Sequence, residues 1–516
     1  MKSAVKAVGA VMAIMLFSRL LSLVSNMAYI TYFGINLETD IYSYAIQLPN
    51  IFFNSLGTAI VTVVIPVFAG LIGTDERERA FRFAGNITGV SLAFTAVLSI
   101  AGVILTPFIL LLTRFRTEGY GFALTALRIM FPIMIFHALS YIFQGILQSL
   151  GKYGMPAFVS VPSSLVVIFY VIAFGNRFGV MGLVIATFIG LALQALILIP
   201  PLLKSGCSLL PSFNYRDEDV RRALKLVPPI LIGTSAYQLN MLFNATLSAN
   251  FKDTVALIST VQNLVLYAIL AFVYSITAVM FPRLTMLAAR GDMEGYRNSI
   301  QKVLRWVIYL LVPATAGFFA VRYPLVDLLY GWGKVTGDNV TLASNILALY
   351  ALGITGIGVK EVLDRAFYSI KDTVRPALNG VIVMAVNIVF SLILISFMGV
   401  LGIPLAFSIS ALTGGFVIVL MIRKRVGEFG GRNLLLSGFK VAAASAIMLM
   451  TVIPLVRFAT GFAPGHALVD KALRLFIPTA AGAFLYLVLT CIMRVNETKQ
   501  ILERLQDGLK FRKEGN

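Results

Sequence analysis

The stretch GKYGMP, residues 151–156, opens a long apolar run that closes with GVMGLVIA, residues 179–186. This stretch decides the fold because a second copy lies 220 residues downstream. The copy opens with KDTVRP, residues 371–376, and closes with GVLGIPLA, residues 399–406. The proline, both glycines and the last alanine keep one offset. Two homologous halves are therefore predicted, an arrangement typical of membrane transporters whose substrate passes between the halves.

The composition indicates an integral membrane protein. Hydrophobic residues make up 59% of the 516 positions and charged residues only 13%, and the mean hydropathy is +0.89. Apolar runs of about twenty residues or more, long enough to cross a bilayer, recur along nearly the whole chain. The first run, residues 8–33, is too long for the core of a signal peptide and shows no cleavage site after it, so it is expected to be a span.

The apolar runs predict an all-α polytopic protein with about fourteen transmembrane helices. A β-barrel is disfavoured because the runs are continuous rather than alternating. The predicted spans are 7–34, 39–72, 83–113, 121–150, 156–176, 179–203, 220–250, 254–282, 299–329, 340–369, 374–397, 399–422, 434–458 and 471–494.

The repeat divides these spans into two pseudo-symmetric six-helix lobes and a C-terminal addition. Residues 1–203 form the N-lobe, and residues 204–433, beginning with a cytoplasmic linker, form the C-lobe. The last two helices, within residues 434–495, have no counterpart in the repeat. Residues 496–516 form a polar tail.

The charges predict the orientation. With fourteen spans, 29 of the 42 lysines and arginines fall on the side of the termini, 9 on the opposite side and 4 within spans. Cytoplasmic loops carry such an excess, so both termini are expected in the cytoplasm. The net charge of +19 is spread over short loops that meet anionic membrane lipids, and it does not indicate nucleic-acid binding.

The sequence lacks the motifs of the common membrane enzymes and pumps. It has no glycine-rich phosphate loop ending in Gly-Lys-Ser/Thr, and no loop presents paired carboxylates beside a metal-ligand pattern. The two cysteines and two histidines form no ligand cluster. We therefore expect no catalysis, no cofactor and no metal site.

Ionisable residues within the spans are the candidate functional residues, because burying a charge at membrane depth is costly. Arg19 and Arg128 have no acidic residue three or four positions away. Each guanidinium is a candidate ligand for an anionic headgroup. Asp40 stands at the start of the second span and is a further candidate.

The tenth span carries two candidate ion pairs. Lys360 and Asp364 are four residues apart, as are Glu361 and Arg365, so each cation faces an anion on one helix. The pairs have one of two roles. They couple transport to an ion or to the substrate, or they allow a polar helix face to pack inside the protein. The residues leave both interpretations open.

Short motifs spread over the whole chain resemble the MurJ family of lipid II flippases, within the multidrug/oligosaccharidyl-lipid/polysaccharide exporter superfamily. The motifs are Phe17-Ser18-Arg19, Phe33-Gly34, Thr39-Asp40, Leu48-Pro49-Asn50, Ile65-Pro66, Leu127-Arg128-Ile129, Phe131-Pro132, Pro156-Ala157-Phe158, Phe281-Pro282-Arg283-Leu284, Tyr330-Gly331 and Lys371-Asp372-Thr373.

The resemblance implies a flippase that moves the undecaprenyl-diphosphate-linked peptidoglycan precursor, lipid II, to the outer leaflet of the bacterial cytoplasmic membrane by alternating access. It implies a central cavity for the headgroup, with the last two helices forming a groove for the polyprenyl tail. The residues expected at the cavity are Arg19, Ser18, Asn26, Asp40, Asn50, Asn54, Arg128 and Asn263. Proteins of cell-wall synthesis are candidate partners.

The chain also departs from the family pattern. Where the family carries charged residues, it has Ser25-Asn26 in the first span, Phe53-Asn54 in the second and Gln262-Asn263 in the eighth. Neutral side chains of this kind can hydrogen-bond sugars. An exporter of another lipid-linked oligosaccharide therefore stays an alternative, as does a non-transporting scaffold of the cell envelope. A drug antiporter is disfavoured, because Asp40 is the one acidic candidate near such a site.

Overall fold

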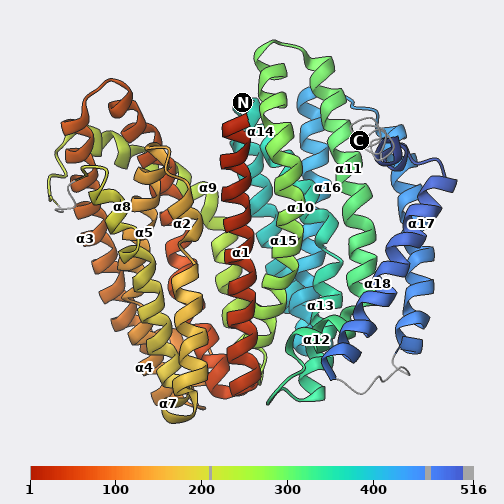
Figure 1. Ribbon diagram of the computed structural model, residues 1–516, viewed down its shortest axis with the longest axis horizontal. Helices are drawn as coiled ribbons and strands as arrows, with labels where there is room; N and C mark the ends of the chain where they lie inside the picture. Colours follow the sequence, from red (N-terminus) through yellow and green to blue (C-terminus); the bar gives the residue numbers. More distant parts are fainter. Residues whose placement is uncertain (1, 208–211, 460–466, 504–516) are drawn as a thin grey trace, which may run out of the picture. The chain divides into compact units, whose positions relative to one another are not determined.

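The computed structural model describes residues 2–207, 212–459 and 467–503, and these fold into helices joined by short turns, with no strand among them (Figure 1). The expectation of an all-helical membrane fold is confirmed. The predicted tail, residues 496–516, lies outside the described residues from position 504 onward.

The chain divides into two compact units, and the first comprises the described residues up to Leu257 together with Gly333–Val335. In this unit α2 packs against α5 and α9, and α1 packs against α7. The elements of this unit are α1 (Lys2–Phe33), α2 (Leu37–Gly73), α3 (Arg77–Leu110), the 3-10 turn η1 (Arg114–Arg116), α4 (Tyr120–Met130), α5 (Ile133–Ser149), α6 (Gly154–Phe158), α7 (Val161–Leu196), α8 (Ile199–Leu203) and α9 (Glu218–Ser248).

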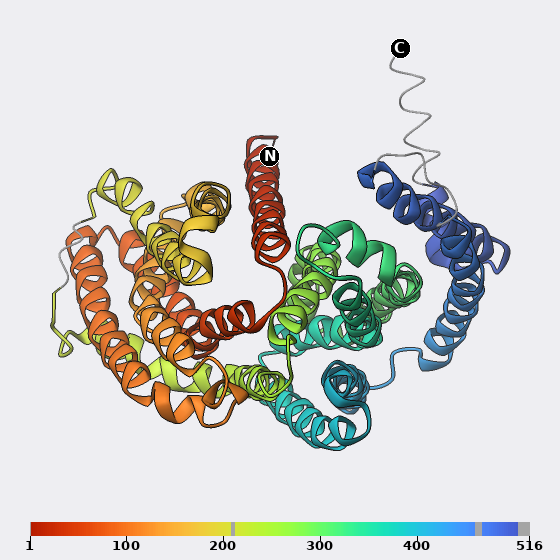
Figure 2. The same cartoon turned by 90° about the horizontal axis from the view of Figure 1, so that it is seen from below.

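The second unit comprises Ile258–Trp332 and the described residues from Thr336 onward. Its α17 lies beside both α11 and α18, as the views in Figure 1 and Figure 2 agree. Its elements are α10 (Val255–Ala289), which begins at the end of the first unit, α11 (Met293–Ala320), α12 (Arg322–Tyr330), α13 (Gly337–Ala351), α14 (Ile354–Ser369), α15 (Val374–Met398), η2 (Gly399–Leu401), α16 (Gly402–Val426), α17 (Gly431–Ala459) and α18 (Ala467–Ile492).

Nine helical segments in the described part of the chain are long and apolar enough to cross a membrane, or ten if the bent pair α13–α14 is one span. Two of the nine, Gly154–Leu203 and Val374–Val426, have 50 and 53 residues, roughly twice the length of one crossing. The total of fourteen crossings stays a prediction.

The sequence repeat has a counterpart in the backbone. Gly179 and Gly399, which the repeat aligns, adopt nearly the same conformation, with positive φ of 59° and 58° and ψ of −152° and −138°. Each breaks a long apolar segment at its middle, where a residue with a Cβ would be strained. The aligned positions Gly151 and Lys371 also share a positive φ, of 74° and 60°. The two halves of the repeat thus turn at equivalent points.

Two further breaks between helices occur at a proline and at a glycine. Helix α4 ends before Phe131 and Pro132, and α5 begins immediately after them. Helices α13 and α14 meet at 43° across Leu352 and Gly353. A proline removes a helical hydrogen bond, and a glycine lowers the cost of a bend. Helix α2, in contrast, continues through Pro49 and Pro66.

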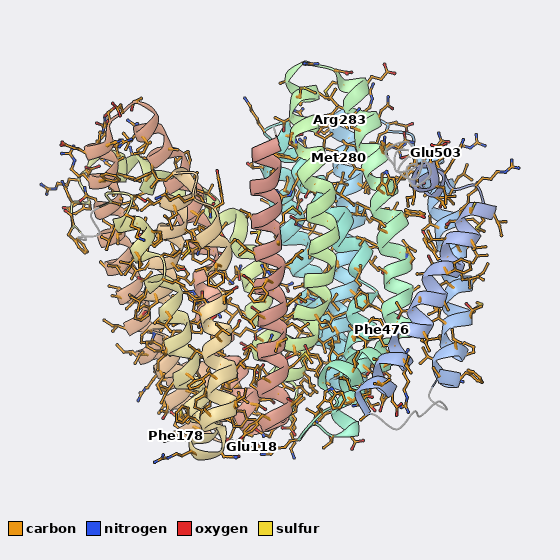
Figure 3. All side chains as sticks on the ribbon, viewed as in Figure 1. Glu118, Phe178, Met280, Arg283, Phe476 and Glu503 are labelled. Atoms are coloured by element: carbon orange, nitrogen blue, oxygen red, sulfur yellow. The ribbon has the colours of Figure 1, made fainter. Side chains whose placement is uncertain are left out.

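Figure 3 labels residues near the ends of the long helices in each unit. In Figure 3, Glu118 and Phe178 lie at the same end of the first unit. Arg283 and Glu503 lie at one end of the second unit, with Phe476 toward the other.

Candidate functional site

Ser18 holds α1 against its neighbours in the first unit. Its buried hydroxyl donates a hydrogen bond to the carbonyl of Ala157, at 3.0 Å. One turn further along α1, the hydroxyls of Ser22 and Ser164 lie 3.2 Å apart. These bonds join α1 to α6 and α7 at positions on both sides of Arg19.

Arg19 is exposed and lies within electrostatic reach of Tyr141 on α5. The Tyr141 ring packs 5.7 Å from the ring of Phe53 on α2, and Phe53 stacks on His137 at 5.8 Å. Helix α5 thus presents a tyrosine near the cation and a histidine one turn away. Tyr141 was not among the predicted site residues. The signal that could have found it is a tyrosine four residues after a histidine inside an apolar helix.

The expected asparagines differ in exposure. Asn50 is half-buried and Asn54 is exposed, one turn apart on α2, so they share a face of that helix. Asn26 on α1 is half-buried. Asn263 is half-buried on α10, in the second unit. Within its own unit, each therefore retains some access to solvent or lipid.

Asp40 lies in a buried cluster rather than on an open surface of its unit. Its side chain is fully buried, and Arg114 donates to one carboxylate oxygen at 3.1 Å. The backbone N–H groups of Thr254 and Ala256, at the beginning of α10, donate to the two carboxylate oxygens at 3.0 Å each. A carboxylate at a helix N-terminus meets unpaired N–H groups and the positive end of the helix dipole.

The guanidinium of Arg114 extends this cluster. It also lies 3.6 Å from Glu118 and 3.8 Å from Asp253. Asp40, which was expected at the substrate, therefore joins α2, η1 and the start of α10 within the first unit. Arg114 was not among the predicted site residues, because it lies 74 residues from Asp40 and no local pattern connects them.

Arg128 is exposed in the last turn of α4, two residues before that helix ends. A cation in this position is favoured by the negative end of the helix dipole. Helix geometry accordingly explains part of its presence in an apolar helix, and its accessible side chain is still free to meet an anion.

Both ion pairs expected in the tenth span form on α14. Lys360 Nζ lies 2.6 Å from Asp364 Oδ2, and Arg365 Nη2 lies 3.3 Å from Glu361 Oε1. Asp364 is nearly buried, whereas the other three side chains are half-buried. The two pairs are neighbours on the helix and together carry no net charge.

Close packing against α16 holds α14 in place. A Cβ added to Gly356 would lie 2.4 Å from the carbonyl oxygen of Ala411, and one added to Gly353 would lie 2.9 Å from Cα of Ser408. Small residues allow membrane helices to approach this closely. Glycines therefore fix the helix that carries the two ion pairs.

An apolar groove of about 600 Å³ runs along α11, α12, α17 and α18 in the second unit. Its walls include Pro313, Phe318, Met448, Val452 and Phe476, the last labelled in Figure 3. Polar side-chain atoms contribute little to it. The groove matches an aliphatic chain in chemistry, and two of its four helices are the pair that follows the repeat.

No group of three or more histidine, cysteine or acidic residues is arranged to hold a metal ion within the described ranges. Cys207 is buried between α8 and α9, and Cys491 is exposed on α18. Neither cysteine forms a disulfide.

The chain matches the family described as "Lipid II flippase MurJ" over residues 29–471. A probable lipid II flippase MurJ from Buchnera aphidicola subsp. Acyrthosiphon pisum is 23% identical over 491 residues, which cover 93% of this chain and 95% of the relative. The lipid II flippase MurJ of Burkholderia cenocepacia is 24% identical, covering 80% of this chain and 82% of its own.

Among solved structures, a lipid II flippase MurJ in an inward closed conformation matches with a TM-score of 0.76 and 21% identity. The match covers 94% of this chain and 98% of that one. An inward-facing multidrug resistance MATE transporter of the MOP superfamily matches with a TM-score of 0.61 and 15% identity, over 78% of this chain and 98% of its own. These likenesses establish the fold.

Proposed function

The chain belongs to the MurJ family of lipid II flippases, and we propose that it moves lipid II from the inner to the outer leaflet of the bacterial cytoplasmic membrane by alternating access. The observation that carries the proposal is the family match over residues 29–471, together with relatives that align over nearly their whole length. The chain is a multi-pass membrane protein, and the charge distribution supports placing both termini in the cytoplasm.

We assign the diphosphate of the substrate to the exposed arginines of the first unit. Arg19 and Arg128 are accessible cations on otherwise apolar helices, and a guanidinium binds phosphate oxygens in pairs. Tyr141 adds a hydroxyl near Arg19. The half-buried Asn26 and Asn50 and the exposed Asn54 offer amide groups for the sugar and peptide parts of the headgroup. In this assignment Asp40 positions helices and does not contact substrate.

We assign the polyprenyl tail to the apolar groove of α11, α12, α17 and α18. The groove's lining is almost entirely apolar, and a long lipid tail gains about 0.8 kcal/mol for each buried methylene group. Gly317 offers a test, because it lines the groove and a Cβ added there would meet nothing within 4 Å. Gly317→Leu therefore adds an apolar side chain to the groove at a position where its Cβ meets no neighbouring atom.

The expected result for Gly317→Leu is a several-fold loss of lipid II transport at unchanged folded yield. Gly121→Leu is the matched control, since Gly121 also lies in a helix with open space around its Cβ position but in the first unit. Equal transport by the two variants would contradict the assignment of the tail to this groove.

A second candidate function is export of another lipid-linked oligosaccharide. It is favoured by the neutral residues Ser25, Asn26, Asn54, Gln262 and Asn263, at positions where the family pattern is charged. Fewer cations mean fewer charge-assisted hydrogen bonds to a diphosphate, each contributing about 1.5–3 kcal/mol.

Complementation distinguishes the two functions. The chain replaces the essential lipid II flippase of a bacterial host under depletion, and growth and envelope insertion are measured together. Growth is expected if the chain carries lipid II. Inserted protein without growth would favour the other glycan. Restoring charge with Asn26→Asp and Asn54→Arg would then be expected to recover growth.

A further inference from the structure

A second cavity, with a volume of about 290 Å³, lies where α11 and α17 meet the chain that follows α18. It belongs entirely to the second unit and is distinct from the apolar groove. Its polar lining comes from Arg305 on α11, Asn433, Ser437 and Lys440 on α17, and Arg494 and Asn496 after α18.

The charge of this cavity is positive. Arg305 forms an ion pair with the buried Glu497 at 2.8 Å. Lys440 Nζ donates one hydrogen bond, to the carbonyl of Met493 at 2.9 Å, and its other two N–H groups have the cavity beside them. Arg494 is exposed. Three cations against one acid leave the site with an excess of two positive charges.

We propose that this cavity binds the phosphate of an anionic phospholipid from the surrounding membrane. Ammonium and guanidinium groups supply charge-assisted donors, and the Ser437 hydroxyl and the two asparagine amides supply neutral ones. Basic pockets between membrane helices are suited to such headgroups.

The surface beside the cavity indicates a lipid rather than a soluble anion. Leu435, Leu436 and Phe439 on α17 are 76%, 55% and 76% exposed, and Leu436 itself lines the cavity. Exposed apolar side chains on a spanning helix face acyl chains. Asn433 and Lys440 lie next to these apolar residues on α17. A polar and a basic residue in this position place the cavity at the boundary between acyl chains and headgroups.

Buried hydrogen bonds hold the wall of the cavity in place. Thr498 donates to the Tyr309 hydroxyl at 3.0 Å, and the Tyr486 hydroxyl donates to the Tyr309 carbonyl at 2.8 Å. Together with the Arg305–Glu497 pair, they fix α18 and the chain after it against α11. The site is therefore formed before the lipid arrives, so little entropy is lost on binding.

The experiment measures lipid binding to the purified full-length chain by native mass spectrometry, with phosphatidylglycerol, phosphatidylcholine and inorganic phosphate as separate probes. The test variant is Lys440→Gln/Arg494→Gln, which leaves the Arg305–Glu497 pair intact. The control is Lys302→Gln/Lys424→Gln, two exposed lysines of the same unit outside the cavity.

We expect one tightly bound phosphatidylglycerol in the unmodified chain and in the control, and binding weaker by about tenfold or more in the test variant. Phosphatidylcholine and inorganic phosphate are expected to bind weakly to all three. Equal binding by the test and control variants would overturn the proposal, as would inorganic phosphate that binds as tightly as the lipid. The measurement requires no transport, so its outcome is independent of the proposed function.

Discussion

Removing the carboxylate of Asp40 is expected to destabilise the first unit strongly. Asp40→Ala leaves the nearly buried Arg114 and the N–H groups of Thr254 and Ala256 without the oxygens that they now share. Breaking a buried ion pair by removing one partner costs about 3–5 kcal/mol. The two lost amide bonds put the expected cost at the upper part of that range.

The companion variants distinguish this explanation from a general sensitivity of α2. Asp40→Asn keeps one acceptor oxygen but turns an NH₂ group toward a donor. Its loss of stability is expected to be smaller than that of Asp40→Ala. In Asp40→Ala/Arg114→Ala no guanidinium is buried without Asp40, and only the more accessible Glu118 and Asp253 lose a partner. The loss is therefore expected to be smaller than the sum of the two single losses. Glu38→Ala, two residues away and exposed, is the control.

The assay is the midpoint of thermal unfolding of each detergent-purified variant, followed by fluorescence-detected size exclusion after heating. The expected order of midpoints, from highest to lowest, is the unmodified chain with Glu38→Ala, then Asp40→Asn, then Asp40→Ala. A midpoint of Asp40→Ala equal to that of Glu38→Ala would refute the reasoning. Such a result would favour the alternative that Asp40 contacts the substrate.

Three further predictions concern single sites. Arg19→Ala is expected to abolish transport at normal folded yield, with Arg19→Lys retaining part of it because the charge but not the paired donors remains; unchanged transport in Arg19→Ala, measured in the same host, would remove Arg19 from the site. Lys360→Ala is expected to lower the folded yield in detergent because it leaves Asp364 unpaired. The charge-reversed variant Lys360→Asp/Asp364→Lys is expected to recover that yield. A folded yield that stays low would mean that a lysine at 360 and an aspartate at 364 are each required. Burial raises the pKa of the Cys207 thiol to about 11. The rate of its labelling by maleimide is therefore expected to be low at neutral pH and to rise only as the pH approaches that value. Labelling of Cys207 at pH 7 as fast as that of the thiol in Lys204→Cys would contradict this.

The repeat was the part of the fold most readily predicted from the sequence. Proline and glycine act on the backbone through their own covalent structure, so aligned residues such as Gly179 and Gly399 mark equivalent turns without knowledge of their neighbours. The same holds for the Lys360–Asp364 pair, because positions four apart on a helix are always neighbours.

Contacts between distant helices could not be predicted in this way. Asp40 meets Arg114 and the start of α10 because α2 and η1 pack together, and no spacing in the sequence records that. The basic cavity joins Arg305, Lys440 and Arg494, which are more than fifty residues apart from one another. Similarly, α9 packs against α2 in the first unit, although the repeat assigns it to the second half.

The most direct test of the account is the appearance of lipid II at the outer leaflet. In cells depleted of their own flippase and producing this chain, the fraction of lipid II cleaved by an externally added lipid II hydrolase is measured before and after induction. We expect the cleaved fraction of lipid II to rise when the unmodified chain is induced and not to rise when Arg19→Ala is induced. An inserted, stable chain that leaves lipid II protected from the hydrolase would contradict the proposed function.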